Sequence, residues 1–556
     1  LHVRSRRQRQ MCIRDRVKPF NEFIATKDGK NVKGVWFEDE YQRYYPYGSL
    51  ACHAIGFTVS GNVGQGGVEG YYSDELNGTD GREYGYLTQD MTLERTTKPP
   101  VNGYNIISTI DANAQSIVEK KINAFMTETG AKNVSALVMD PNSGEILAMA
   151  NSNSFDLNEP YEDSAIAYQF NSEDGDVSSQ IKALSEDERL DCLNKAWRNF
   201  IISDGFEPGS TYKTFTISGA IEDGALKGDE TFFCGGNLKV ADTTINCHNH
   251  SGHGQVNIEQ SLMQSCNVAL MQIAETEGRK TFAKYQEVFG FGKTTHVDLA
   301  GEAAGLVYPE EKLNPVELAT SSFGQGLTVT MMQIGTAFCS VINGGNYYEP
   351  HMVKQIVDEN GGIINNIEPT ILRKTISSET SEFMRNALFE VVSNGTARKA
   401  QVAGYTIGGK TGTAEKLPRG NGKYLLSFIG FAPVENPQVV VYVTVDEPNV
   451  EDQASSGLGT IIAQSILQEL LPYMNIYQSD SENKSEGADV GDQVATPIFD
   501  GAAPTEQLSE DLQNSTEEGS SENATEASTE VGTDSNTTEA TTENTTQATT
   551  QAPAAQ

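Results

Sequence analysis

The motif Ser210-x-x-Lys213 constrains this chain more than any other feature, because it places a hydroxyl and an amine at the start of a predicted helix. Pro208 and Gly209 precede the helix-like run over 214–220, which is typical of a helix N-terminus. Residues three apart share one face of a helix, so the amine can lie beside the hydroxyl. Serine needs a neighbouring base to act as a nucleophile, and a partly desolvated lysine can be that base. The free N–H groups of the first turn suit a developing oxyanion.

Two later stretches strengthen this motif, which is weak on its own. Ser265-Cys266-Asn267 follows a helix-like run over 258–264, and Lys410-Thr411-Gly412-Thr413 lies in a strand-like run over 405–415. Each stretch alone has a structural explanation, as packing in a helical turn, a helix cap, or a turn at the end of a strand. The three elements together, in this order, favour a catalytic serine site.

The combination resembles the motifs of class A β-lactamases and penicillin-binding proteins, which carry Ser-Asp-Asn in the middle position. The resemblance to class B penicillin-binding proteins covers most of residues 41–470. It includes pieces of their pedestal segment, namely Arg43–Gly48, Ala54–Phe57, Gly67–Gly70 and Leu76–Gly78. It implies an α+β fold of the penicillin-binding transpeptidase type, similar to serine β-lactamases. This fold has a mainly antiparallel sheet flanked by helices, here with an N-terminal β-rich pedestal.

The resemblance also implies a role for each catalytic residue. Ser210 would attack the carbonyl between two terminal D-alanines of a peptidoglycan stem peptide, and Lys213 would accept its proton. Ser265 would relay a proton between Lys213 and the leaving amine. Asn267 would orient Lys213 and hydrogen-bond the substrate amide.

The implied substrate-binding residues are Lys410, Thr411, Gly412 and Thr413. Thr411 would hold the terminal carboxylate of the substrate, and Gly412 would leave room for its backbone against the strand. The N–H groups of Ser210 and Thr413 would form the oxyanion hole. An amine of a second stem peptide would then form the cross-link, whereas a β-lactam antibiotic would leave a stable acyl-enzyme. The predicted function is therefore that of a peptidoglycan D,D-transpeptidase in cell wall biogenesis.

Three other functions are alternatives. A D,D-carboxypeptidase would use the same acylation and is separated by kinetics with an amine acceptor. A β-lactamase would need an extra base to activate the deacylating water, and no residue is identified for that role. A non-catalytic β-lactam sensor or scaffold is the third alternative, and the three intact elements count against it.

The length and the net charge of the chain limit its possible domain organisation and its possible partners. A chain of 556 residues is too long for one ordinary domain, and its formal net charge of −36 argues against nucleic acid as a partner. The predicted segments are an Arg-rich leader over 1–16 that is unfolded or not native, a partial pedestal (dimerisation) domain over 17–104, a transpeptidase domain over 105–476, and a disordered acidic Ser/Thr-rich tail over 477–556. The tail lacks the large apolar side chains that a core needs.

The expected location follows from the resemblance, since the sequence contains no run of eighteen apolar residues that could span a bilayer. The family implies a single N-terminal membrane anchor, missing from this chain, and an extracytoplasmic catalytic domain. The expected partners are stem peptides that end in D-Ala-D-Ala, β-lactam antibiotics and a membrane glycan polymerase.

Local patterns predict several elements of the catalytic part. A hairpin is predicted over 134–139 and 145–150, and a helix over 112–127 with Asp111 as its cap. Further strands are predicted over 405–415, 424–432 and 439–445, and a helix over 461–471 that covers the sheet. The region 151–191 is predicted to be a surface loop with some helix near 185–193.

Cys234 and Cys247 bracket a short stretch, and His248, His250 and His253 follow directly after it. Two paired thiols, two free thiols and a zinc site are the alternatives. A disulfide would stabilise this loop by roughly 3 kcal/mol. Zinc ranks last, because the spacing of the two cysteines does not match a Cys-x(2–4)-Cys knuckle and the serine mechanism has no role for a metal. The resemblance agrees, because the Cys…Cys…His-Gly pattern recurs in relatives without a metal role. We therefore expect no metal and no cofactor.

Overall fold

The computed structural model describes residues 17–33, 43–87, 93–171 and 175–478. The predicted leader and all but the first two residues of the predicted tail lie outside this range, so those two predictions stay untested. Within the described residues, no helix is both long enough and apolar enough to cross a membrane.

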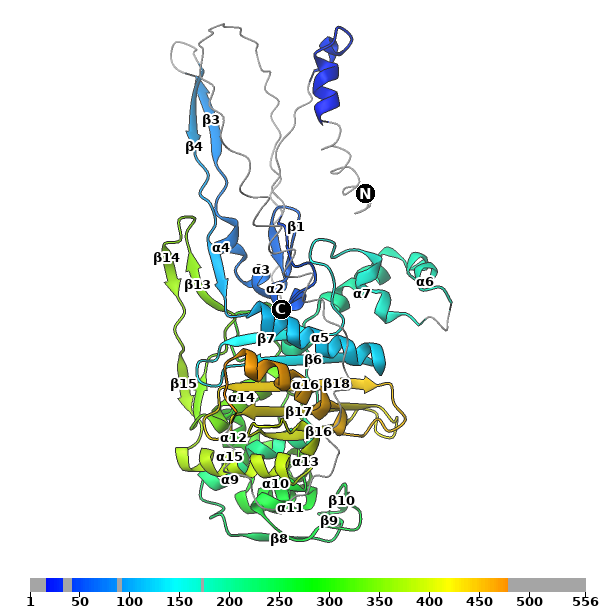
Figure 1. Ribbon diagram of the computed structural model, residues 1–556, viewed down its shortest axis with the longest axis vertical. Helices are drawn as coiled ribbons and strands as arrows, with labels where there is room; N and C mark the ends of the chain where they lie inside the picture. Colours follow the sequence, from blue (N-terminus) through cyan, green and yellow to red (C-terminus); the bar gives the residue numbers. More distant parts are fainter. Residues whose placement is uncertain (1–16, 34–42, 88–92, 172–174, 479–556) are drawn as a thin grey trace, which may run out of the picture. The chain divides into compact units, whose positions relative to one another are not determined.

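A five-stranded antiparallel sheet with the order β16–β17–β18–β6–β7 forms the centre of the catalytic part (Figure 1). Its strands are β6 (Ala131–Met139), β7 (Ile146–Asn151), β16 (Gly408–Glu415), β17 (Tyr424–Ala432) and β18 (Val439–Pro448). The hairpin and all three later strands predicted from the sequence are confirmed. Most side chains of β6, β17 and β18 are buried on both faces, which explains why these strands are continuous apolar runs in the sequence.

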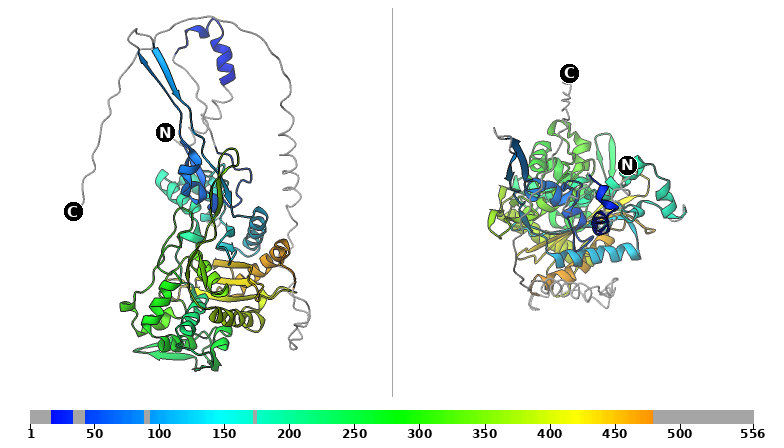
Figure 2. Two further views of the ribbon diagram at one scale, coloured as in Figure 1. Left: turned by 90° about the vertical axis from the view of Figure 1, so that its left-hand side faces the viewer. Right: turned by 90° about the horizontal axis from the view of Figure 1, so that it is seen from above.

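Helices cover both faces of this sheet (Figure 2). On one face lie α5 (Ala112–Glu128) and α16 (Gly457–Tyr473), which pack against each other. The carboxylate of Asp111 caps α5 by accepting the N–H groups of Asn113 and Ala114, both at 2.9 Å. On the other face lie α8 (Phe200–Ser203) and α14 (Met331–Ile342). The predicted cap of α5 and the predicted covering helix α16 are thus confirmed.

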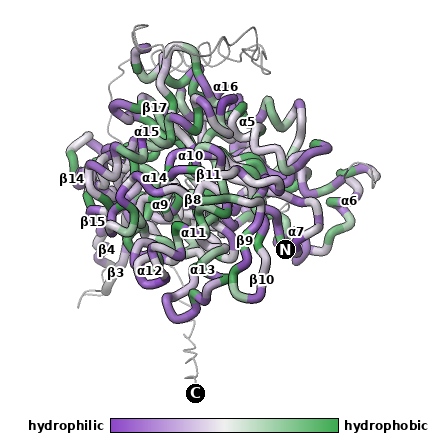
Figure 3. The backbone as a smooth tube through the Cα atoms, turned by 90° about the horizontal axis from the view of Figure 1, so that it is seen from below, coloured by the Kyte–Doolittle hydropathy of each residue, from purple (hydrophilic) through white to green (hydrophobic). Residues whose placement is uncertain are grey.

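The helical part beside the sheet is organised around α9 (Lys213–Glu222), whose first eight residues are all buried. α9 contacts α11, α12, α14 and α15. The remaining helices of this part are α10 (Ile258–Met263), α11 (Asn267–Glu277), α12 (Arg279–Val288), α13 (Pro315–Ser321) and α15 (Ser378–Ser393). Figure 3 looks onto the side of this part where α10, α11 and the short strand β8 lie next to one another.

Short ladders and 3-10 turns complete the catalytic part. β8 (Thr231–Cys234) pairs with β11 (Gly254–Asn257), β9 (Asn237–Val240) with β10 (Thr243–Asn246), β12 (Asn346–Tyr348) with β15 (Ile371–Lys374), and β13 (Val353–Val357) with both β5 (Asn105–Ser108) and β14 (Ile363–Asn366). The 3-10 turns of this part are η2 (Asp163–Ala165), η3 (Ala167–Gln169), η5 (Gly209–Tyr212), η6 (Glu310–Lys312) and η7 (Arg398–Ala400), whereas η1 (Gly29–Asn31) belongs to the N-terminal part.

The N-terminal part contains short helices in addition to β ladders. Its elements are β1 (Phe57–Val59), β2 (Val63–Gln65), β3 (Arg82–Leu87), β4 (Leu93–Lys98), α2 (Cys52–Ile55), α3 (Gly67–Tyr71) and α4 (Ser73–Asn77). Gly56, Gly66 and Gly78 have positive φ and flank these helices. The helices were not predicted because helices of four or five residues are too short to show a helical period in the sequence.

The prediction of a surface loop over 151–191 is wrong for much of that segment. It contains α6 (Val177–Ala183) and the start of α7 (Glu186–Trp197), which Ser185 and Glu188 cap reciprocally. Phe155, Leu157 and Ile166 are buried in a second hydrophobic cluster together with Phe57 of the N-terminal part. These apolar residues follow no helical or strand period, so their burial could not be predicted from the sequence pattern. The predicted helix near 185–193 is confirmed.

Candidate active site

Ser210 lies on η5, a 3-10 turn that leads directly into α9. Gly209 has a φ of +57°, and a Cβ atom at this position would lie 2.5 Å from the carbonyl oxygen of Thr413. The N–H of Gly209 donates to the carbonyl of Gly324 at 3.0 Å, and a Cβ atom on Gly324 would lie 2.1 Å from Gly209 O. The turn that carries Ser210 is therefore held by main-chain contacts between strand β16 and the loop before α14.

Lys213 is fully buried, and its Nζ donates three hydrogen bonds to the Ser-Cys-Asn turn. The acceptors are Ser265 O at 2.6 Å, Ser265 Oγ at 3.1 Å and Asn267 Oδ1 at 2.7 Å. Burial lowers the pKa of Lys213 to about 7. The amine thus exchanges its proton near neutral pH, and its position is fixed by both residues that the sequence placed beside it.

Ser265 connects Lys213 with the third motif. Lys410 is also fully buried and donates from Nζ to Ser265 Oγ at 3.1 Å. Burial and the charge of Lys213 hold the pKa of Lys410 well below its usual range. Ser265 has a φ of +53°, an uncommon conformation for a residue other than glycine, so the surrounding contacts must hold it there. One hydroxyl therefore bridges two buried amines.

The third motif lies on β16, the edge strand of the sheet. Thr411 Oγ1 is 3.2 Å from Thr396 Oγ1, so two hydroxyls lie together at the predicted carboxylate site. A Cβ atom on Gly412 would lie 2.3 Å from Ser427 Oγ and 2.9 Å from Pro208 O, so this position has no room for a side chain. The structure thus brings the eight residues selected from the sequence to one place, where η5, the Ser-Cys-Asn turn and β16 meet.

Some neighbours of the site were not recognised in the sequence. Thr396 is one of them. Glu207 is another, since its carboxylate accepts the N–H of Gly326 at 3.0 Å and pairs with Arg419 in the loop between β16 and β17. Nothing in the sequence links Glu207 to a residue so distant along the chain, whereas its place directly before the serine motif was a usable signal.

A sulfur-rich cluster lies behind the Ser-Cys-Asn turn and was recognised only in part. Cys234, Cys247, His253 and Cys266 have ligand atoms that all lie within 4.8 Å of one another. The three cysteines are free thiols, so the structure contains no disulfide between Cys234 and Cys247. Cys266 belongs to the Ser-Cys-Asn motif itself, so its position in that motif was the available signal that it lies near the site.

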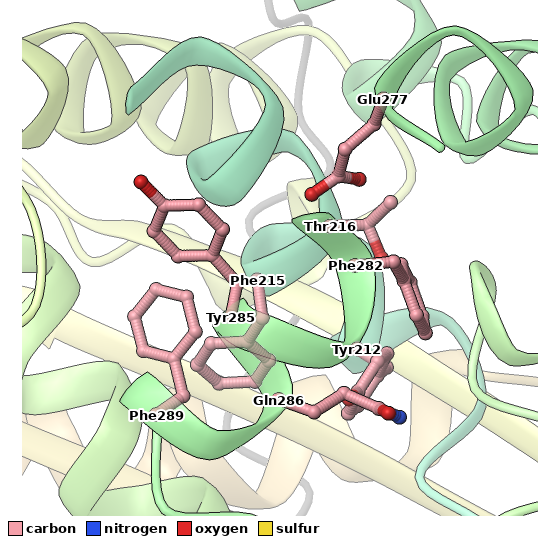
Figure 4. A pocket seen from close by; sticks show the side chains of 8 residues that line it. All are labelled: Tyr212, Phe215, Thr216, Glu277, Phe282, Tyr285, Gln286 and Phe289. Atoms are coloured by element: carbon pink, nitrogen blue, oxygen red, sulfur yellow. The ribbon is translucent and has the colours of Figure 1, made fainter. Parts of the chain in front are cut away.

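A small pocket beside α9 contains a second buried ionisable group (Figure 4). Glu277 at the end of α11 points into it, among the rings of Tyr212, Phe282 and Tyr285. Burial, and to a smaller extent the charge of Asp223, raise the pKa of Glu277 to about 9. Among the described residues, neither carboxylate oxygen of Glu277 has a hydrogen-bond partner. Tyr212, which lies between Ser210 and Lys213 in the first motif, lines this pocket, whereas Ser210 and Lys213 themselves do not.

Comparison with known proteins identifies the family. A model of the penicillin-binding protein transpeptidase domain matches residues 134–468, and a model of the penicillin-binding protein dimerisation domain matches residues 4–108. The chain belongs to the class B penicillin-binding proteins. The matched transpeptidase region includes all three motifs.

Individual class B relatives agree with this assignment. The chain is 33% identical over 479 residues to stage V sporulation protein D of Bacillus subtilis, covering 83% of this chain and 69% of that protein. It is 30% identical over 426 residues to a probable peptidoglycan D,D-transpeptidase, PenA, of Neisseria gonorrhoeae, covering 74% and 65% respectively. A crystal structure of penicillin-binding protein 3 from Mycobacterium tuberculosis superposes with a TM-score of 0.64 at 27% identity, covering 78% of this chain and 91% of that one. The α+β transpeptidase fold is thereby confirmed.

Proposed function

We infer that this class B penicillin-binding protein is a serine-type peptidoglycan D,D-transpeptidase of cell wall synthesis, and we propose that Ser210 carries the acyl group. One observation carries the assignment of residues. The buried amine of Lys213, three positions from Ser210, is held by Ser265 and Asn267, and Ser265 is in turn bonded to Lys410. A nucleophile, a base and a path for the proton therefore lie together.

In the first half of the reaction, Ser210 Oγ attacks the carbonyl between the two terminal D-alanines of the donor stem peptide. Its proton passes to Lys213, whose pKa of about 7 suits transfer in both directions. The N–H groups of Ser210 and Thr413 stabilise the oxyanion. The C–N bond breaks as Ser265 delivers a proton to the departing amine, and D-alanine leaves.

Substrate binding is assigned to the β16 edge and its neighbours. The hydroxyls of Thr411 and Thr396 donate to the terminal carboxylate of the donor peptide, and the buried amine of Lys410 lies 3.4 Å from Thr411 Oγ1. The donor backbone lies along β16, where Gly412 presents no side chain.

In the second half, an amine of another stem peptide attacks the acyl-enzyme and forms the cross-link, while Lys213 and Ser265 remove its proton. A β-lactam acylates Ser210 in the same way, but its leaving amine stays tethered to the acyl group and blocks the acceptor. Two of the similar structures are complexes of the Mycobacterium tuberculosis protein with aztreonam and with ampicillin, which supports β-lactam binding by this chain.

The substrate sets the location and the partners. Stem peptides are cross-linked outside the cytoplasmic membrane, so we place the transpeptidase domain (105–476) on that side, with an N-terminal anchor and the pedestal domain (17–104) on its membrane side. A membrane glycan polymerase is the proposed partner, because it makes the strands that this enzyme cross-links.

The assignment is tested by mass spectrometry of the purified chain with and without a labelled penicillin. We expect one adduct on the peptide that contains Ser210, and none on Ser210→Ala. Labelling that persists in Ser210→Ala overturns the assignment of the nucleophile. Incubation with a D-Ala-D-Ala peptide and an amine acceptor then separates the activities, since a carboxypeptidase releases D-alanine without forming the cross-linked product.

A further inference from the structure

Four potential metal ligands converge directly behind the Ser-Cys-Asn turn. Cys234 ends β8, Cys247 follows β10, His253 precedes β11, and Cys266 is the N-cap residue of α11. Their three sulfur atoms and a ring nitrogen of His253 all lie within 4.8 Å of one another, and the three cysteines are buried. Four separate elements thus direct their ligand atoms to a single point.

We propose that this cluster is a structural zinc site, with the three thiolates and His253 Nδ1 as ligands. Three cysteines and one histidine form a common ligand set for structural zinc. With Zn–S bonds of about 2.3 Å and a Zn–N bond of about 2.1 Å, tetrahedral angles place sulfur and nitrogen about 3.6 Å apart. His253 Nδ1 lies 3.5 Å from Cys234 Sγ and 3.6 Å from Cys247 Sγ. These two distances match the separation expected for a tetrahedral site, and the other ligand atoms lie within 4.8 Å of one another.

The surroundings of the cluster fix the ligands and favour thiolates. The Ala269 N–H donates to Cys266 Sγ at 3.3 Å, at the N-terminus of α11, where the helix dipole favours negative charge. The Cys247 N–H donates to Gly236 O at 2.9 Å. A Cβ atom on Gly252 would lie 2.3 Å from Cys234 O, so the loop that carries His253 is folded tightly against β8. The ligand positions are therefore set by the protein backbone.

This proposal reverses the ranking from the sequence. In the sequence, Cys234 and Cys247 were considered together with the three nearby histidines and without Cys266, and the spacing of the two cysteines does not form a zinc knuckle. In the structure Cys266 supplies the third sulfur from a different helix, so no second cysteine close in the sequence is required. The serine mechanism has no role for a metal in its chemistry, and the site we propose acts on the position of the catalytic turn.

Zinc at this site would hold the turn that positions the base. Cys266 is flanked by Ser265 and Asn267, which provide all three acceptors of Lys213 Nζ. The left-handed conformation of Ser265 requires such a restraint. Cys266 is therefore a positioning residue, and this part of the inference rests on the proposed function.

The site is tested by elemental analysis of the full chain, purified without an affinity tag or chelator under reducing conditions. We expect about one zinc ion per chain, and intense tetrahedral d–d and thiolate charge-transfer bands when Co²⁺ replaces zinc. Cys234→Ser should lose its zinc to a chelator that leaves the wild-type protein loaded. Cys339→Ser, which removes a buried cysteine of α14 outside the cluster, should keep it.

Less than a tenth of a zinc ion per chain overturns the proposal, as does a disulfide between two cluster cysteines in a non-reducing peptide map. For the positioning role, stripping zinc should slow penicillin acylation at least tenfold, and added zinc should restore it, while circular dichroism stays unchanged. Acylation that is indifferent to zinc removal overturns that role. Because metal content is measured independently of acylation, failure of the zinc site cannot be confused with failure of Ser210 as nucleophile.

Discussion

Burial shifts the pKa values of two ionisable groups in opposite directions: Lys213, the first residue of α9, and Glu277, which lines the pocket beside α9. Lys213 is surrounded by three oxygen acceptors, and burial lowers its pKa to about 7. Glu277 faces aromatic rings, and burial raises its pKa to about 9. Both shifts disfavour charge, as low dielectric surroundings must. The difference lies in the partners, since the lysine can gain and lose a proton in place whereas the carboxyl group is kept neutral.

The comparison indicates which buried group contributes to chemistry and which only affects stability. A group with hydrogen-bond partners in its site can be held at the correct position in both protonation states. A carboxyl group without partners costs free energy whenever it ionises. We therefore expect changes at Lys213 to alter the reaction and changes at Glu277 to alter unfolding.

The largest effect is expected for Lys213→Ala. Without its base, Ser210 should be acylated by a labelled penicillin about 10²–10⁴-fold more slowly, as measured by the second-order rate constant. The melting temperature should change far less than the rate. Lys280→Ala, which removes an exposed lysine of α12, is the matched control and should react normally. A Lys213→Ala protein that acylates at the wild-type rate would mean that another group takes the proton.

The next effect is expected for Ser265→Ala, which removes the hydroxyl between the two buried amines. Acylation should fall about 10²-fold, because the proton loses its path to the leaving amine. The rate constants for acylation and for transpeptidation of a D-Ala-D-Ala peptide should fall together. If only the melting temperature falls, the Ser265 hydroxyl contributes to packing and not to the reaction. The contrast between the Lys213 site and Glu277 would then no longer hold.

An effect on stability is expected for Glu277→Gln. The folded protein keeps a proton that the unfolded chain releases above its ordinary pKa of 4.5, so the stabilisation is complete below that pH and is lost as pH rises towards 9. Glutamine resembles the protonated acid at every pH. Urea unfolding should give similar stabilities near pH 5, and near pH 8.5 the variant should be more stable by about 1–3 kcal/mol. Glu287→Gln, on the exposed side of α12, should show no such trend. Equal pH dependence in wild type and Glu277→Gln would contradict the raised pKa.

The smallest effect is expected for Lys284→Ala. Its ion pair with Asp223 is 2.8 Å long and largely exposed, and exposed pairs contribute less than about 1 kcal/mol. The urea midpoint should therefore move only slightly, and penicillin acylation should stay unchanged. A loss of stability comparable with that caused by a buried group would show that the exposed pair of Lys284 and Asp223 is coupled to the pocket around Glu277.

The sequence was informative where the physics is local. The cap at Asp111, the hairpin of β6 and β7, and the spacing of Ser210 and Lys213 each depend on a few neighbouring residues, and each is present in the structure. Ser265, Asn267 and the residues of β16 were assigned to the same site because the order of the motifs resembles that of the penicillin-binding proteins.

The sequence was less informative where contacts join distant residues. The ion pair between Glu207 and Arg419 depends on how the chain folds, and so does the position of Cys266 beside Cys234, Cys247 and His253. No period or spacing in the sequence encodes these contacts. The burial of Phe155 and Leu157 was not predicted for the same reason, because they pack against the N-terminal part and not against their own neighbours in the chain. The pocket around Glu277 was also missed, since a glutamate at a helix end normally indicates a solvated position.

The contacts around Ser210 differ in how much substitution they tolerate. Gly209, Gly324 and Gly412 meet neighbouring backbone or side-chain atoms so closely that any larger residue would push the nucleophile turn away from β16. Glu207 and Arg419 meet through flexible side chains, which can be exchanged without moving that backbone. Substitutions that change the surroundings of Ser210 without moving η5 away from β16 are therefore expected at Glu207 and Arg419, and not at the three glycines.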